Sequence, residues 1–213
     1  MNFNKSPGSD GLPVEFYKKF WTVIRSDFME MVKFVKDLKQ LSDSQSLGVI
    51  KLIAKTGNLE LVENWRPITL LNVDYKIISK VIANRLKIVM DKVISKEQYC
   101  GVTGRSIVSC NNTIRDVIHY SKEKDMEMAI LSLDWSKAFD RVSLQFVFKV
   151  MKKFGFPDEF IEWMAGLYKN CNSRVSVNGS LSSSFNVRRS IRQGCPTIYV
   201  IICNFSRTFV SGY

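Results

Sequence analysis

The stretch from Ala129 to Asp140 constrains the fold of this chain more than any other. It reads Ala-Ile-Leu-Ser-Leu-Asp-Trp-Ser-Lys-Ala-Phe-Asp. The mostly apolar run before Asp134 predicts a buried strand over 129–134 that carries a carboxylate at its C-terminal end. Ligand and metal sites in sheet proteins favour that end, and a charge there is costly unless it is paired or bound to a metal. Two interpretations remain open at this point: Asp134 holds a metal ion, or it is a solvated residue in a polar turn.

The charge of the chain favours a polyanionic partner. The 213 residues, enough for one large domain or two small ones, carry a net charge of +11. Residues 169–213 contain six Lys or Arg residues and no Asp or Glu. This surplus points to nucleic acid first and an acidic membrane surface second, although many basic proteins bind no nucleic acid.

The cysteines argue against a zinc site. They are odd in number and scattered, and no Cys-x-x-Cys pair occurs: Cys100, Cys110, Cys171, Cys195 and Cys203. With a single histidine beside them, a reduced intracellular compartment is the simplest interpretation. The N-terminus shows no signal-peptide pattern and no apolar run is long enough to span a bilayer. We therefore expect a soluble chain in the cytoplasm or nucleus with no membrane partner.

The apolar periodicity predicts a mixture of helices and strands, without internal repeats. Apolar residues recur at helical spacing over 13–39, 74–95, 107–123, 142–154 and 157–169. Strands are expected over 47–54 and 65–71 around a turn at 55–64, and a second hairpin over 174–188. Pro67 lacks an amide donor, which predicts an edge or irregular strand there. The helix positions expected to face the core include Phe16, Phe20, Val23, Ile24, Met31, Val35, Ile78, Val81, Ile82, Leu86, Val89, Val93, Phe146, Val147, Val150, Met151 and Phe154.

Lys55 and Arg66 bracket the first hairpin. If the tip of the hairpin folds over a phosphate, both cations could reach it. The alternative is that both are solvated charges that flank a turn.

Nucleotide polymerisation would need two divalent cations about 3.5–4 Å apart, held by carboxylates, and further cations on the triphosphate. Asp134 could supply one carboxylate. Asp140 could not easily share a metal with it, because six residues of extended strand span roughly 20 Å and six residues of helix place the two acids on different faces. Any second ligand must come from elsewhere, and no acid follows Glu162.

Several ordered motifs resemble those of reverse transcriptases of non-LTR (LINE-type) retrotransposons. Leu133–Asp140 is similar to the first palm motif of this family. The other similar blocks, in the order and spacing of the family, are 6–21, 64–77 with 83–86, 98–106, 177–179 and 192–196. Each block alone is modest, whereas the ordered set over about residues 5–196 is highly specific.

The resemblance implies a metal and sugar site around the central stretch. Asp134 would ligate catalytic magnesium ions, and Trp135 would offer a backbone ligand or a contact nearby. Phe139 would lie under the sugar and exclude a 2′-hydroxyl, so that deoxynucleotides are selected.

The resemblance also implies contacts to the incoming nucleotide and the template. Lys55 and Arg66 would clamp the triphosphate, and Gln193 and Gly194 would contact the incoming nucleotide and template. Arg105 is a weaker candidate for template contact. The implied reaction is template-directed nucleotidyl transfer by a two-metal mechanism, with an RNA template, a DNA primer and deoxynucleoside triphosphates as partners.

The implied fold is α+β: a right-hand polymerase with an incomplete sheet and no thumb. Residues 1–125 would form a fingers-like subdomain with an N-terminal extension helix, and 126–213 a partial palm. Nothing in the sequence fixes the oligomeric state.

The last residues depart from the family. Thr197–Tyr213 lacks the pair of adjacent aspartates that follows this block in the family. We therefore expect a truncated or frameshifted copy that is inactive alone, because losing metal-based charge stabilisation costs on the order of thousands-fold in rate or more. Two alternatives remain: a non-catalytic RNA- or DNA-binding module that uses the basic residues, and a transposon relic of low stability without a cellular role.

Overall fold

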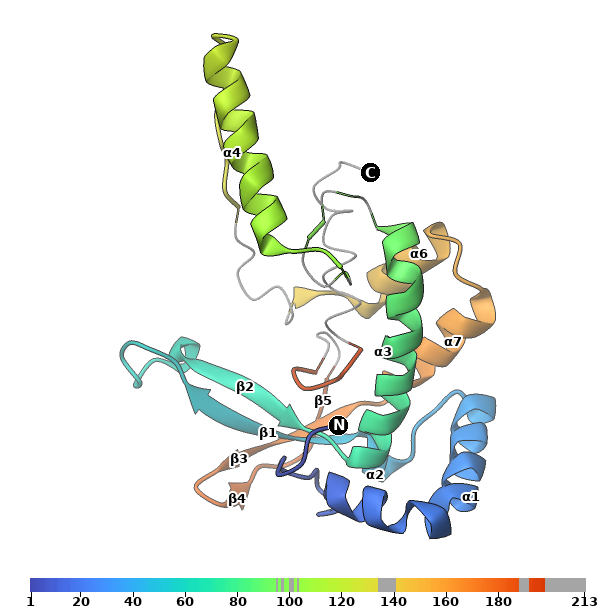
Figure 1. The fold of residues 1–213 in the computed structure, drawn as a ribbon. Coiled ribbons are helices and arrows are strands. Elements are labelled where there is room, and N and C mark those ends of the chain that lie inside the picture. Colours follow the sequence, from blue (N-terminus) through green and yellow to red (C-terminus); the bar gives the residue numbers. More distant parts are fainter. Residues whose placement is uncertain are drawn as a thin grey trace.

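The computed structural model describes residues 1–94, 96, 98–99, 102, 104–133, 141–187 and 192–197. The α-helices are α1 (Val14–Leu38), α2 (Asp43–Ser46), α3 (Val73–Val93), α4 (Ile107–Glu123), α6 (Leu144–Lys153) and α7 (Asp158–Gly166). The strands are β1 (Leu47–Ala54), β2 (Trp65–Leu70), β3 (Asn172–Val177), β4 (Ser180–Leu181) and β5 (Phe185–Asn186), with a 3-10 turn, η1 (Val62–Asn64), between β1 and β2. The fold is thus mixed α/β with a partial sheet, consistent with the predicted class (Figure 1).

The sheet has the order β2-β1-β3-β4, with β5 also paired to β3. β1 and β2 form an antiparallel hairpin, whereas β1 and β3 run parallel. Parallel neighbours require a long crossover, and here it contains α3, α4, α6 and α7. Pro67 lies in β2 at the edge of the described sheet, as its missing amide donor predicts.

The core forms where α3, α6 and α7 pack together beside the sheet (Figure 1). Its most deeply buried side chains are Leu71, Val73, Tyr75, Ile82, Val147, Met151, Met164 and Leu167. α1 is tied to α7 at one end, where Lys36 Nζ lies 3.1 Å from Glu159 and Lys39 pairs with Glu162. A Cβ on Gly166 would lie 2.7 Å from the Lys39 carbonyl carbon, so this glycine permits the close approach of the two helices.

The predicted helices are confirmed, but several are less buried than their apolar faces suggest. α1, α3 and α4 match the predicted ranges within two residues, and α7 begins at Asp158 after Pro157 but ends three residues early. Five residues predicted to face the core are exposed: Phe20, Val23, Val81, Val89 and Phe154. α1 and α3 each bury a narrow stripe, because the layer beside them covers only one side. The side chain of Val93 lies outside the described part.

The two predicted hairpins are also confirmed. β1 and β2 cover 47–54 and 65–70, and the second hairpin consists of β3, β4 and β5 around a turn at Asn178 and Gly179. Both turn residues have positive φ, which Asn and Gly adopt more readily than other residues.

The predicted buried strand over 129–134 is wrong for residues 129–133. They form no strand, and Ile130, Leu131 and Leu133 are 70%, 79% and 68% exposed. An apolar run becomes a buried strand only when a neighbour supplies ladder hydrogen bonds and a second layer covers one face. The described sheet gives this run neither. Asp134 itself lies outside the described residues.

α4 differs from the other long helices because none of its residues is buried. It projects away from the sheet and from α3 (Figure 1). No described helix is long and apolar enough to cross a membrane.

Candidate functional site

The β1–β2 hairpin presents Lys55 and Arg66 together. Arg66 pairs with Ile53 across the two strands, and Lys55 follows two residues after Ile53. Both cations therefore lie at the end of the hairpin that adjoins its turn. Both are exposed. The Lys55 ammonium donates to the Glu63 carbonyl oxygen at 3.2 Å, a partner that an anion could replace.

The tip of this hairpin is an ordered turn. The Lys55 amide donates to the Asn64 carbonyl oxygen at 2.8 Å, and Asn64 Nδ2 donates to the Asn58 carbonyl oxygen at 2.6 Å. Trp65 Nε1 donates to the Leu59 carbonyl oxygen at 2.9 Å. These bonds hold the two ends of the tip, so that Lys55 and Arg66 are presented by a closed loop.

Gln193 and Gly194 lie against the outer edge of β2. The Thr69 amide donates to the Gln193 carbonyl oxygen at 2.7 Å. Gly194 has φ +123°, and a Cβ there would lie 2.5 Å from the Thr69 carbonyl oxygen. Glycine is therefore required both by the backbone conformation and by the close approach of the two segments. The loop thus contacts β2 at Thr69, which lies three residues, or roughly 10 Å, from Arg66 on the same strand.

The segment after Gly194 is held by a cluster of buried hydroxyl and thiol groups. Cys195 Sγ lies 3.1 Å from the Tyr75 hydroxyl and 2.9 Å from Thr197 Oγ1. The Tyr168 hydroxyl lies 2.8 Å from Thr197 Oγ1. Tyr75 lies in the first turn of α3 and Tyr168 precedes β3, so the cluster joins parts of the chain that are up to 120 residues apart.

Arg192 lies next to this cluster and is only 3% exposed. Its Nη1 donates to the Ser46 carbonyl oxygen at 2.7 Å, and its Cζ lies 4.8 Å from the centre of the Tyr75 ring. Nε and Nη2 are buried and make no hydrogen bond among the described residues. No described acidic side chain forms an ion pair with Arg192. Burying a charged guanidinium without an ion-pair partner carries a large desolvation cost.

Burial dominates the titration of this cluster. It raises the pKa of Tyr75 and of Tyr168 well above the ordinary value, and it also raises the pKa of the Cys171 thiol. Burial alone would lower the pKa of Arg192, but the neighbouring Tyr75 and the two thiols outweigh it and raise that pKa. The phenols are therefore neutral and the guanidinium charged at neutral pH.

Arg105 occupies a different part of the molecule. Its guanidinium donates to the Gln98 carbonyl oxygen at 2.7 Å and to the Ile94 carbonyl oxygen at 3.4 Å. It follows the C-terminal end of α3, whereas β2 leads into the N-terminal end. Because α3 has 21 residues, its C-terminal end near Arg105 lies roughly 30 Å from its N-terminal end near β2. The structure does not bring Arg105 to the hairpin.

The central predicted residues Asp134, Trp135 and Phe139 lie outside the described residues, as does Asp140. In the described part, no three His, Cys, Asp or Glu side chains gather as a metal site. The three described cysteines, Cys110, Cys171 and Cys195, are free thiols.

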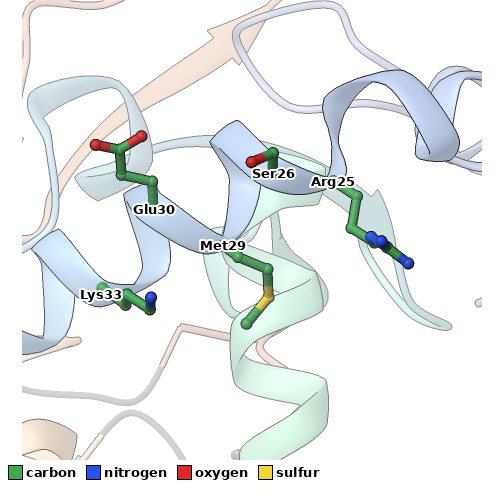
Figure 2. A pocket seen from close by; sticks show the side chains of 5 residues that line it. All are labelled: Arg25, Ser26, Met29, Glu30 and Lys33. Carbon is green, nitrogen blue, oxygen red and sulfur yellow. The ribbon is translucent and has the colours of Figure 1, made fainter.

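A shallow hollow lies on α1, away from the hairpin. Five exposed side chains of that one helix line a space of about 490 Å³: Arg25, Ser26, Met29, Glu30 and Lys33 (Figure 2). All of them come from successive turns of α1, so no second element closes the hollow. It adds no chemistry to the site around β2.

Sequence reasoning missed Arg192 and the hydroxyl and thiol groups beneath the loop. Arg192 was included there in the motif block 192–196 and in the basic surplus, but it was given no role of its own. Its position before Gln193 was the one available signal, but burial of a cation depends on partners such as Ser46 and Tyr75, which lie more than 100 residues away in the sequence.

Comparison with known proteins identifies the family of this chain. Residues 53–206 match the family described as reverse transcriptase (RNA-dependent DNA polymerase). The transposon TX1 uncharacterized 149 kDa protein of Xenopus laevis is 38% identical over 196 residues, which cover 92% of this chain and 15% of that protein. The retrovirus-related Pol polyprotein from type-1 retrotransposable element R2 of Popillia japonica is 25% identical, over 90% of this chain and 26% of that protein. The R2DM polyprotein of Drosophila melanogaster is 24% identical, over 92% of this chain and 18% of its own length.

The chain therefore spans about a sixth to a quarter of the length of these relatives. The matched family region covers β2, the loop on its edge and most of the core, and the relatives are retrotransposon proteins. This chain belongs to the reverse transcriptase family, as a reverse transcriptase domain of the non-LTR retrotransposon type.

Proposed function

We propose that this domain takes part in template-directed nucleotidyl transfer, with an RNA template, a DNA primer and deoxynucleoside triphosphates as substrates. The observation that carries the proposal is the arrangement around β2: this strand carries Arg66, Lys55 follows its partner strand β1, and the Gln193–Gly194 loop lies on its outer edge. A nucleotide bound there would meet positive charge at its phosphates and a glycine-containing backbone beside it.

Lys55 and Arg66 are proposed to clamp the triphosphate. Both are exposed beside the turn of a closed hairpin, and an arginine can bind two phosphate oxygens with one planar group. Gln193 and Gly194 are proposed to contact the nucleotide and template, since the loop leaves no side chain at Gly194 to obstruct a ligand. Arg105 is proposed to contact the template further away, at the other end of α3.

Reverse transcriptases generally use divalent metal ions. Asp134, with the backbone near Trp135, is proposed to hold magnesium, which would stabilise negative charge on the phosphates when bound. Phe139 is proposed to lie beneath the sugar and select deoxynucleotides. We also propose that residues 1–125 correspond to fingers and 126–213 to part of a palm.

Nucleotide binding by the purified chain tests this function. We expect a fluorescent deoxynucleoside triphosphate to bind in the presence of Mg²⁺, and Lys55→Ala or Arg66→Ala to weaken binding about tenfold each, as expected for charge-assisted hydrogen bonds. Lys87→Ala and Arg85→Ala are matched controls, because these exposed α3 cations lie off the hairpin. Equal losses in the controls would mean that general charge, and not the hairpin, binds the nucleotide.

Primer extension on an RNA template with Mg²⁺, with Asp134→Asn as control, tests catalysis directly. Asp134-dependent incorporation would show that the chain is active alone, contrary to the expectation from its last residues.

The net charge of +11 favours a second function, nucleic-acid binding without catalysis. Filter binding over a salt series tests it: affinity should fall steeply as salt rises, since each neutralised phosphate releases counterions. An affinity independent of salt, or no binding at low salt, would exclude this function.

A further inference from the structure

We propose that Arg192 is a positioning residue of the nucleotide site. Its buried guanidinium fixes the Gln193–Gly194 loop relative to the strand that carries Arg66. This inference rests on the proposed function, because the loop and Arg66 are taken to contact the same nucleotide.

The first step concerns the loop itself. The Cys195 amide donates to the Arg192 carbonyl oxygen at 3.0 Å, so that residues 192–195 form one tight turn. The Thr69 amide holds that turn on one side through Gln193, and Tyr75 holds it on the other through Cys195. A movement of Arg192 would therefore displace the whole turn.

The second step concerns the anchor. Arg192 Nη1 donates to the carbonyl oxygen of Ser46, and β1 begins at the next residue, Leu47. β1 in turn pairs with β2, and Ile53 of β1 lies opposite Arg66 of β2. This hydrogen bond therefore connects the base of the loop to the start of β1, in addition to the bond between Thr69 and Gln193 that connects the loop to β2.

The third step concerns cost. Two of the three guanidinium nitrogens of Arg192 are buried without a hydrogen-bond partner in the described part of the chain. An apolar side chain of similar volume would fill this space with less desolvation. Arginine, however, offers a long reach to Ser46 together with a planar face over Tyr75, a combination that places the loop at a defined position.

The test uses a substitution that keeps the charge. Arg192→Lys preserves the positive charge and therefore the overall attraction for phosphate, but it loses the planar group over Tyr75. Arg174→Lys is the matched control, because Arg174 is exposed on β3 and pairs with Val49 on the neighbouring strand. Both variants and the unchanged chain are studied by amide hydrogen exchange and by binding of a fluorescent deoxynucleoside triphosphate with Mg²⁺.

We expect Arg192→Lys to accelerate exchange at the Thr69 amide about tenfold or more, because that amide is protected by the Gln193 carbonyl oxygen. Amides of α6, around Val150 and Met151, report global opening and should change much less. Nucleotide affinity should fall about tenfold in the same variant, as expected when a charge-assisted contact is misplaced. Arg174→Lys should leave the exchange at Thr69 unchanged.

Three results with the Arg192→Lys variant would overturn the positioning role. Unchanged exchange at Thr69 in Arg192→Lys would show that the guanidinium does not hold the loop. Faster exchange with unchanged nucleotide affinity would show that the loop position does not matter for binding. Equal acceleration at Thr69 and in α6 would reveal a general effect on stability. If the unchanged chain binds no nucleotide, the proposed function fails and the positioning role fails with it, whereas binding by the unchanged chain confines any failure to Arg192.

Discussion

Two regions of this molecule both contain many apolar residues, but one region buries these side chains and the other exposes them. The body, formed by the sheet with α1, α3, α6 and α7, buries Leu71, Tyr75, Met151 and Leu167 completely. The arm, which we define as residues 104–133 with α4 at its centre, exposes its large apolar side chains: Ile107, Val108, Ile114, Val117, Ile118, Tyr120, Met126, Met128, Ile130, Leu131 and Leu133.

The difference shows that periodicity decides the type of element and not its burial. α4 is amphipathic and begins with Ser106 as an N-cap, whose Oγ accepts the Val108 amide at 3.2 Å, so it satisfies the local rules for a helix. Its apolar face nevertheless meets no second layer in the described structure. The body is covered because its segments converge from distant parts of the chain, as the Tyr75–Cys195 contact illustrates.

The largest expected difference is in local opening. An isolated helix of 17 residues is marginal in water, whereas opening of the core requires much of the unfolding free energy. We expect α4 amides to exchange at least about a thousandfold faster than the amides of Ile78 and Ile82 in α3. Hydrogen exchange followed by mass spectrometry measures this. Comparable protection in α4 and α3 would show that α4 is as well covered in solution as the core.

Truncation of one leucine in each region gives the next largest contrast. Leu167→Ala removes a fully buried side chain and should lower the free energy of unfolding by about 2–5 kcal/mol. Leu131→Ala removes a side chain that is 79% exposed and should change it by less than about 0.5 kcal/mol. Urea unfolding followed by circular dichroism measures both, and a similar loss in the two variants would mean that the arm is covered in solution.

The tyrosines of the body predict a loss of stability in alkali. Burial, with the nearby carboxylates of Asp74 and Asp10, raises the pKa of Tyr17 to about 12 from 10.0. A folded-state pKa above the unfolded value favours the neutral phenol in the fold. Its stabilisation is therefore complete below pH 10 and is lost as pH rises through about 12.

Tyr17→Phe should remove this part of the pH dependence, up to roughly 2–3 kcal/mol between pH 10 and 12. Urea midpoints across that range measure the slope, with the same variant at pH 7 as reference. An unchanged slope would show that Tyr17 is not buried in solution.

The smallest expected effect tests whether burial, and not membership of the body, governs stability. Lys36 and Glu159 form an ion pair within the body, but their side chains are 50% and 75% exposed. Glu159→Ala should therefore lower the free energy of unfolding by no more than about 1 kcal/mol. Thermal melts at low and high salt measure it, and a loss as large as that of Leu167→Ala would contradict this rule.

Much of the fold could be predicted from the sequence, whereas for the candidate site the sequence motifs supplied residues whose roles are untested. Helical spacing predicted α1, α3, α4, α6 and α7, and the turn residues predicted both hairpins, since these signals are local. The ordered motifs predicted the family that the comparisons confirm. The roles of Asp134, Lys55, Arg66, Phe139, Gln193, Gly194, Trp135 and Arg105 remain predictions.

Tertiary structure alone decided which of these segments meet. It brought Gln193 to Thr69 and Arg192 to Ser46, across 124 and 146 residues, and it left residues 129–133 exposed where a buried strand was expected. The physical reason is range. The helical period and the preferences of turn residues act over a few residues. Burial and strand pairing depend instead on segments that are distant in the sequence and cannot be identified from the local pattern.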